Sequence, residues 1–137
     1  MRPGESWPGV RAVSGWLSPD RKVSPVDDPW KLLVEESARW GLALDPGTIE
    51  RMKRFAERLL EANATHNLTR ITDPRDLVIK HLLDSLSVCQ ALSDREQAGS
   101  RFIDLGSGPG FPCIPLAIAL KGLSGVSLEA TGKKVAF

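Results

Sequence analysis

A glycine-rich segment, RFIDLGSGPGFP at residues 101–112, constrains the fold of this chain more than any other stretch. Residues 101–105 are short and apolar around one acid, Asp104, which is typical of a buried strand. Three alternating glycines follow, and then the apolar run 114–120. A turn that reverses within so few residues needs backbone angles that a β-carbon disfavours. The pattern therefore predicts a strand, a glycine turn and a helix.

Turns of this kind bind nucleotide-like ligands at the carboxyl ends of strands in doubly wound sheets. The bare backbone lets a ligand come close, and the following helix offers free N–H groups and the positive end of its dipole. The spacing is G-x-G-x-G, which differs from the dinucleotide pattern G-x-G-x-x-G. A second acid, Glu129, follows a predicted strand at 125–128 and could accept hydrogen bonds from ribose hydroxyls. Taken alone, the segment also fits a purely structural glycine turn.

Three helices are predicted upstream, and each begins with the same signal, an aspartate followed by proline. Aspartate is a good N-cap, and proline suits the first helical position. Asp28 would cap a helix over residues 29–40, and Asp45 a second, amphipathic one. Asp73 would cap a third helix, whose apolar stripe runs through Leu92.

The composition gives no sign of a strongly basic nucleic-acid binder, a metal-binding protein or a membrane-spanning protein. A length of 137 residues suits one domain, and the formal net charge of +1 does not indicate a nucleic-acid binder by bulk charge. The cations between Arg51 and Arg58 alternate with glutamates, which fits a solvated helix face or a weak phosphate-contacting surface. Two cysteines and two histidines show no metal spacing, so we expect no metal and a reducing, cytoplasmic setting. No apolar run approaches the ~20 residues of a membrane span.

Four motifs, in order, carry a family resemblance. DLGSGPGFP and the later SLEATGKKVAF resemble the first two motifs of Rossmann-like S-adenosylmethionine-dependent methyltransferases. Upstream, HNLTRITDP (66–74) and KHLLDSL (80–86) resemble signatures of the bacterial small-subunit ribosomal RNA guanine-N7 methyltransferases, also called glucose-inhibited division protein B. The resemblance covers about residues 29–137. It implies an α/β fold, in which N-terminal helices precede the start of a Rossmann-like methyltransferase sheet.

The same resemblance implies a reaction and its partners. The expected activity is N7-methylation of a guanine in 16S ribosomal RNA, with S-adenosylmethionine as cofactor and 16S ribosomal RNA or the small ribosomal subunit as partner. No catalytic base is expected, because guanine N7 carries a lone pair and no proton. Attack on a sulfonium methyl group can then proceed by positioning and electrostatics.

The resemblance also gives cofactor-binding roles to individual residues. Two glycines would let the backbone approach the methionine moiety, an aromatic ring would pack on the ligand, and two acids would organise the turn and the ribose. The cofactor-binding residues are Asp104, Gly106, Gly108, Phe111 and Glu129.

Substrate placement is the role expected for Asn67, His81 and Asp84. His81 and Asp84 are three residues apart and therefore neighbours on a helix, an arrangement that equally fits a structural pair. One position departs from the family pattern. The residue after Phe111 and Pro112 is usually glycine, and Cys113 stands there, so we expect its side chain to crowd the helix against the strand.

Three regions are expected: a disordered leader (1–28), a helical region (29–100) and a first βαβ unit of a methyltransferase domain (101–137). The chain stops where a second helix of the sheet should begin, so we expect a truncated methyltransferase that is inactive as given. Two alternatives remain open. One is a helical module that binds RNA without catalysis, and the other is a fragment of a nicotinamide-dependent oxidoreductase, against which the glycine spacing speaks.

Overall fold

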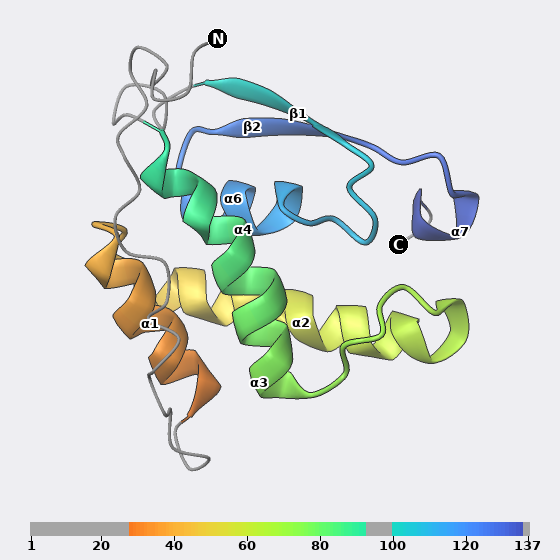
Figure 1. The fold of residues 1–137 in the computed structure, drawn as a ribbon, viewed down its shortest axis with the longest axis horizontal. Coiled ribbons are helices and arrows are strands. Elements are labelled where there is room, and N and C mark those ends of the chain that lie inside the picture. The colour runs from red at the N-terminus through yellow and green to blue at the C-terminus, as the bar shows by residue number, and fades with distance from the viewer. Residues whose placement is uncertain (1–27, 93–99, 136–137) are drawn as a thin grey trace, which may run out of the picture.

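The computed structural model describes residues 28–92 and 100–135, and it shows a group of helices packed against a short parallel sheet (Figure 1). This arrangement confirms the predicted α/β class, with N-terminal helices before a Rossmann-like βαβ unit. The leader expected at 1–28 lies outside the described residues, except for Asp28.

Residues 28–92 form two separate helices and one longer helical segment made of four consecutive parts. These elements are α1 (Pro29–Arg39), α2 (Pro46–His66), α3 (Pro74–Leu77), the π-helical turn η1 (Val78–Leu83), α4 (Asp84–Ser87) and the 3-10 turn η2 (Val88–Gln90). The βαβ region follows after the residues that are not described. Its elements are β1 (Arg101–Leu105), α6 (Cys113–Ala119), β2 (Ser124–Leu128) and α7 (Gly132–Val135).

The three predicted aspartate caps are confirmed. In each case a carboxylate oxygen accepts a hydrogen bond from a backbone N–H in the first turn, which satisfies a donor that has no partner within the helix. The proline that follows each aspartate has no N–H to satisfy. The bonds run from Trp30 N–H to Asp28 (3.0 Å), from Thr48 N–H to Asp45 (2.8 Å) and from Asp76 N–H to Asp73 (2.9 Å).

The segment from α3 to η2 is helical, as predicted, but its middle is a π-helical turn. A π-turn takes more residues per turn than an α-helix, so it rotates the residues after it relative to the expected faces. Ser85, a polar residue just after this turn, is buried, and its hydroxyl donates to the His81 carbonyl at 2.6 Å. The buried face of this helical segment therefore continues past the π-helical turn and includes the polar residue Ser85.

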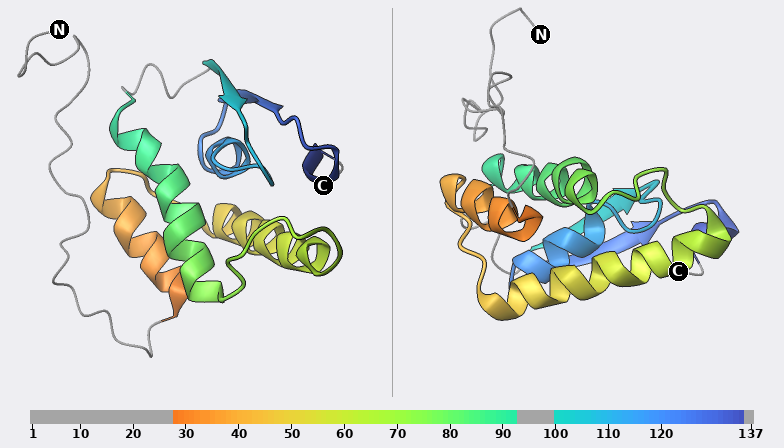
Figure 2. Two further views of the ribbon diagram at one scale, coloured as in Figure 1. Left: turned by 45° about the vertical axis from the view of Figure 1, so that its right-hand side comes forward. Right: turned by 90° about the horizontal axis from the view of Figure 1, so that it is seen from below.

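Helix α6 lies at the centre of the fold, because it contacts β2, α2 and α4. Figures 1 and 2 show it between the two strands and α2. The core fills the space between these helices, and α1 packs on η1 at its edge. Its largest fully buried apolar side chains are Leu33, Met52, Leu59, Leu77, Val78, Leu82, Leu86 and Pro115.

The two strands pair in parallel, with Arg101 opposite Ser124 and Leu105 opposite Leu128. The expectation that β1 is buried is wrong for one of its faces. Ile103 and Leu105 are 65% and 77% exposed, and Leu128 on β2 is 49% exposed. Strand side chains alternate between the two faces, and the described helices cover only the face that carries Phe102 and Asp104.

The crowding expected at Cys113 does not occur, because a glycine stands opposite. Cys113 is buried at the start of α6, and its sulfur would lie only 2.8 Å from a β-carbon at Gly125. The same β-carbon would lie 2.5 Å from the ring of Phe102. The missing side chain on β2 therefore makes room for Cys113 and Phe102 beneath the sheet.

This packing predicts that Gly125→Ala destabilises the chain. The added methyl group would force Phe102 or Cys113 to move, and overpacking of this kind costs about 1–3 kcal/mol of the free energy of unfolding. Urea unfolding followed by circular dichroism measures the change. Gly132→Ala is the matched control, since a β-carbon there meets nothing within 4 Å. Equal unfolding midpoints for the two variants would contradict the packing described.

Candidate cofactor-binding site

A cavity of about 400 Å³ lies beside the glycine loop, where the carboxyl ends of both strands meet. Its volume falls within the range of small-molecule sites, and open α/β sheets bind ligands at this edge. The wall combines bare backbone, two hydroxyls, a carboxylate and an ammonium group. The lining residues are Ser107, Gly108, Pro109, Gly110, Ile114, Ser127, Leu128, Glu129 and Lys134.

The loop adopts backbone angles that favour glycine. Gly106, Gly108 and Gly110 have φ values of 77°, 57° and 101°. A β-carbon at Gly110 would clash with Ile114, so this glycine is required for packing. A β-carbon at Gly106 or Gly108 would meet nothing within 4 Å, so the space beside these two residues is open to a ligand.

Glu129 ties the loop to the end of β2. One carboxylate oxygen accepts from the Gly108 N–H at 2.9 Å, and the other accepts from the Thr131 N–H at 2.7 Å. Hydrogen bonds from Thr131, and then from Gly108, lower the pKa of Glu129 below its ordinary value, with the charge of Lys134 adding to the effect. The group is therefore ionised at neutral pH. Each oxygen keeps a further lone pair that can accept from a ligand hydroxyl.

Asp104 holds the other side of the loop. Its carboxylate accepts from the Cys113 N–H at 3.1 Å, which satisfies one of the unpaired donors at the start of α6. Burial raises the pKa of the Cys113 thiol, and the charge of Asp104 raises it further. The hydroxyl of Ser107 in the loop is hydrogen-bonded to the hydroxyl of Ser127 on β2.

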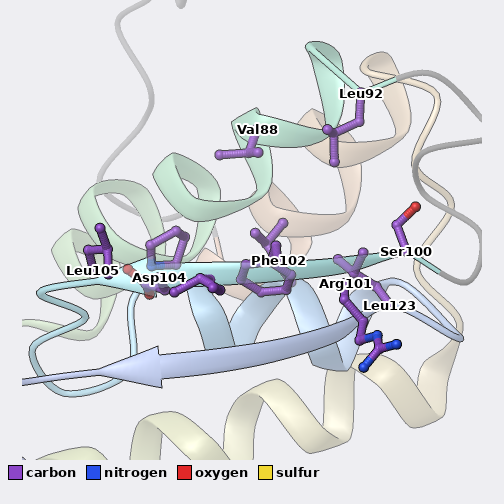
Figure 3. A pocket seen from close by; sticks show the side chains of 11 residues that line it. Val88, Leu92, Ser100, Arg101, Phe102, Asp104, Leu105 and Leu123 are labelled. Carbon is purple, nitrogen blue, oxygen red and sulfur yellow. The ribbon is translucent and has the colours of Figure 1, made fainter.

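A larger cavity of about 610 Å³ lies on the other side of β1, between this strand and the helical segment that carries Val88 and Leu92 (Figure 3). Most of its wall is apolar, with Phe102, Leu105 and Leu123 among the labelled side chains. It contains neither the open glycines nor Glu129. The smaller cavity is therefore the better candidate for a polar cofactor.

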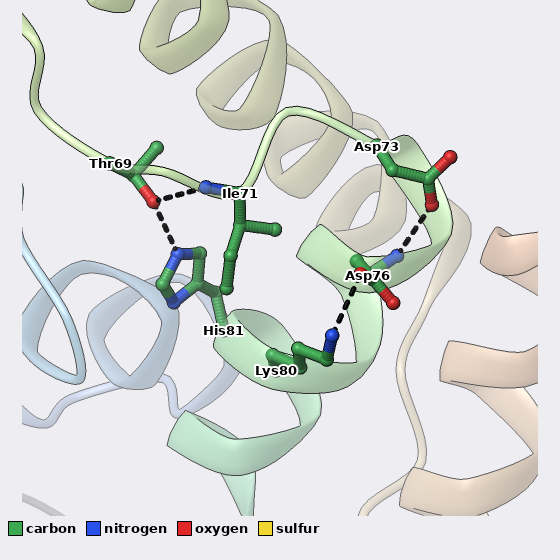
Figure 4. Close-up of polar contacts among 6 residues, drawn as sticks. All are labelled: Thr69, Ile71, Asp73, Asp76, Lys80 and His81. Atoms are coloured by element: carbon green, nitrogen blue, oxygen red, sulfur yellow. Dashed lines mark hydrogen bonds and ion pairs between the residues drawn. The ribbon is translucent and has the colours of Figure 1, made fainter.

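Three sequence motifs meet behind the loop. The Thr69 hydroxyl and His81 Nε2 are 2.9 Å apart (Figure 4), and the His81 ring stacks on Phe111 with centroids 4.4 Å apart. Phe111 in turn makes an edge contact with Phe55 at 5.3 Å. Burial lowers the pKa of His81, while Asp84 raises it in part, so the neutral imidazole predominates at pH 7.

Comparison with known proteins identifies the family of this chain. The family model described as GidB, rRNA small subunit methyltransferase G, matches residues 48–137. This chain belongs to the GidB family. The match includes the glycine loop, Glu129 and the two upstream motifs, and it confirms the resemblance drawn from those residues.

Curated relatives support the same family. The chain is 39% identical over 107 residues to ribosomal RNA small subunit methyltransferase G of Thermoanaerobacter sp. (strain X514), which covers 78% of this chain and 44% of the relative. It is 43% identical over 105 residues to the protein of that name from Roseiflexus castenholzii, a match that covers 77% of this chain and 44% of the relative. It is 44% identical over 104 residues to the protein of that name from Sorangium cellulosum, a match that covers 76% of this chain and 43% of the relative. The chain therefore spans less than half the length of these GidB relatives.

The structure brings only some of the predicted cofactor residues to the cavity. Gly108 and Glu129 line it together, while the Gly106 N–H donates to the Leu128 carbonyl at 2.7 Å. Asp104 lies under the loop at the start of α6, and the Phe111 ring lies between His81 and Phe55. The cofactor roles of all five residues stay predictions for this GidB chain.

Of the predicted substrate-placing residues, His81 is half-buried, whereas Asn67 and Asp84 are exposed. Asn67 ends α2 in a left-handed conformation (φ 50°), and its N–H donates to the Asn63 carbonyl at 3.2 Å. Asp84 follows η1 and acts electrostatically on His81. Their substrate roles also stay predictions.

Several residues that shape the site were not singled out from the sequence. Asn63 accepts the Thr69 N–H at 2.8 Å and so fixes the loop after α2. Its place near the end of a helix was a usable signal, because asparagine often bonds backbone there. Nothing local pointed to the pairing of Ser107 with Ser127 or to the contact of Phe55 with Phe111, since both join segments that are distant in sequence.

Residues 28–92 and 100–135 contain no group of three or more His, Cys, Asp and Glu side chains that could hold a metal ion. No helix there has the length and apolar character needed to cross a membrane. Cys89 is buried, and burial raises the pKa of its thiol to about 11.

The lowered pKa of Glu129 predicts that the loop loosens in acid. A carboxylate whose pKa is lowered by folding stabilises the folded state above its ordinary value of 4.5, and this contribution is lost as the pH falls through the lowered pKa. We expect exchange of the Gly108 amide, corrected for the intrinsic rate and followed by NMR, to become several-fold faster across that range. Glu129→Gln should remove the pH dependence, and Glu57→Gln on the exposed side of α2 should retain it. A profile that Glu129→Gln leaves unchanged would refute the assignment.

Proposed function

We propose that this chain binds S-adenosylmethionine in the cavity beside the glycine loop, as part of an enzyme that methylates N7 of a guanine in 16S ribosomal RNA. The observation that carries the proposal is the bridge from Glu129 to the Gly108 N–H at the carboxyl ends of the strands. Membership of a family described as rRNA methyltransferases supports the reaction class.

The residues present fit such a cofactor. Glu129 would accept hydrogen bonds from the ribose hydroxyls, since its oxygens retain free lone pairs. The open backbone at Gly106 and Gly108 would receive the methionine moiety. Asp104 would keep the turn in shape through the start of α6, and Phe111 would support the loop from behind.

The chemistry needs placement more than proton transfer. The bound cofactor supplies a methyl group on a positively charged sulfur, which is open to direct attack. Guanine N7 has a lone pair and no proton, so no base among the described residues has to act. Holding guanine N7 in line with the methyl group of the cofactor would accelerate methyl transfer by positioning alone.

The RNA substrate would approach from the helical side of the loop. Asn67 and Asp84 are exposed, and we keep them with the half-buried His81 as candidates for placing the nucleotide. Arg54, Arg58 and Arg70 are exposed and would offer phosphate contacts. Because the chain spans less than half of its relatives, methyl transfer to 16S ribosomal RNA or the small ribosomal subunit is proposed for the whole protein.

The proposal predicts saturable binding of S-adenosylmethionine in a calorimetric titration of the purified chain, and none of a nicotinamide dinucleotide. Gly108→Ala should weaken binding at least about tenfold, because its methyl group enters the space beside the loop. Gly41→Ala is the matched control, since Gly41 also has a positive φ (81°) and an open β-carbon position but ends α1. It should bear a similar strain of about 1–2 kcal/mol and leave binding intact.

Binding of neither ligand, with the chain folded by circular dichroism, would refute cofactor binding by this chain. Salt-dependent RNA binding under the same conditions would then favour a non-catalytic RNA-binding module. For the whole protein, mass spectrometry of 16S ribosomal RNA should detect N7-methylguanosine after incubation with S-adenosylmethionine.

A further inference from the structure

The glycine loop offers only one large side chain through which the rest of the protein can hold it. Residues 106–110 are glycine, serine, glycine, proline and glycine, and Phe111 follows directly. Its backbone N–H closes the loop on the Ser107 carbonyl at 2.9 Å. Whatever fixes the Phe111 ring therefore also fixes the end of the loop.

Two rings from the helical region fix Phe111. The His81 ring lies nearly parallel to it, with centroids 4.4 Å apart and an angle of 13° between the planes. Phe55 on α2 meets it edge-on, at 5.3 Å and 64°. Both geometries are favourable for aromatic pairs.

The orientation of His81 is fixed in turn by Thr69. The Thr69 hydroxyl lies 2.9 Å from His81 Nε2 and also accepts from the Ile71 N–H at 3.1 Å (Figure 4). The Thr69 N–H donates to the Asn63 side chain at 2.8 Å. The imidazole, which lies in the π-helical turn η1, is thus held at one nitrogen and covered on one face.

We propose that His81 is a positioning residue that holds the glycine loop in its binding conformation. Thr69 fixes the His81 ring, and the stacked Phe111 ring links His81 to the loop. This inference rests on the proposed function, because it treats residues 106–111 as the loop that receives S-adenosylmethionine. It gives His81 a role that does not require contact with the RNA base. A loop ordered before the ligand arrives loses less entropy on binding.

Amide hydrogen exchange of peptides covering residues 106–113, measured by mass spectrometry without cofactor, tests the proposal. His81→Ala loses both the stack and the hydrogen bond, so exchange in these peptides should rise roughly three- to tenfold. His81→Phe keeps the stack and should give a smaller rise. Thr69→Val should resemble His81→Phe, and Thr69→Ser, which keeps the hydroxyl, should restore the wild-type rate.

Thr65→Val is the matched control, because the Thr65 hydroxyl donates to the Ala62 carbonyl at 3.1 Å within the exposed end of α2. Exchange in α1 should not change in any variant, which separates loosening of the loop from global unfolding. If His81→Ala does not fold, the Thr69 pair decides the question. Equal exchange in Thr69→Val and Thr65→Val, or failure of Thr69→Ser to restore protection, would overturn the proposal.

A titration with S-adenosylmethionine separates this proposal from the proposed function. If the wild-type chain binds, Thr69→Val should raise Kd while Thr65→Val does not, and equal affinities would overturn the positioning role. If the wild-type chain does not bind, the proposed function fails for this chain. The exchange measurements then still decide whether His81 holds the loop.

Discussion

The site depends on two carboxylates that hold the backbone amides of a loop with few side chains of its own. Asp104 accepts from the first N–H of α6, and Glu129 accepts from the Gly108 N–H in the middle of the turn. A loop with three glycines loses much conformational freedom when it is ordered. Charged hydrogen bonds of this kind are stronger than neutral ones, so they can offset that loss without filling the space that a ligand would occupy.

Parallel pairing brings these two acids to the same loop. In the register observed, Leu105 lies opposite Leu128, so both strands end at the same edge. Asp104 stands one residue before that end and accepts from the Cys113 N–H after the turn, whereas Glu129 stands one residue after it and accepts from the Gly108 N–H within the turn. A register shift of one residue would reverse the face on which each side chain lies and would separate the acids from the amides they satisfy.

Features governed by neighbouring residues could be predicted from the sequence. The Asp-Pro starts of the helices, the strand before the glycines and the strand before Glu129 all follow from local preferences, and the structure has each of them. The π-helical turn at 78–83 was missed, because the apolar spacing of this segment fits an ordinary helix equally well. The exposure of Ile103 and Leu105 was missed as well, since an apolar strand does not reveal which elements cover its faces.

The contacts behind the loop show why prediction of the site was only partial. Thr69, His81 and Phe111 belong to three separate motifs, and each motif taken alone fits a capping loop, a helix or a turn. They come together because α6 packs against α2, α4 and β2 and so brings the end of the glycine loop to the helical region. The helical region is therefore part of the structure that shapes the loop, in addition to the βαβ unit. If the His81 ring moved, Phe111 would lose its stacked partner and keep the edge contact with Phe55, so the helical region would hold the end of the loop less firmly.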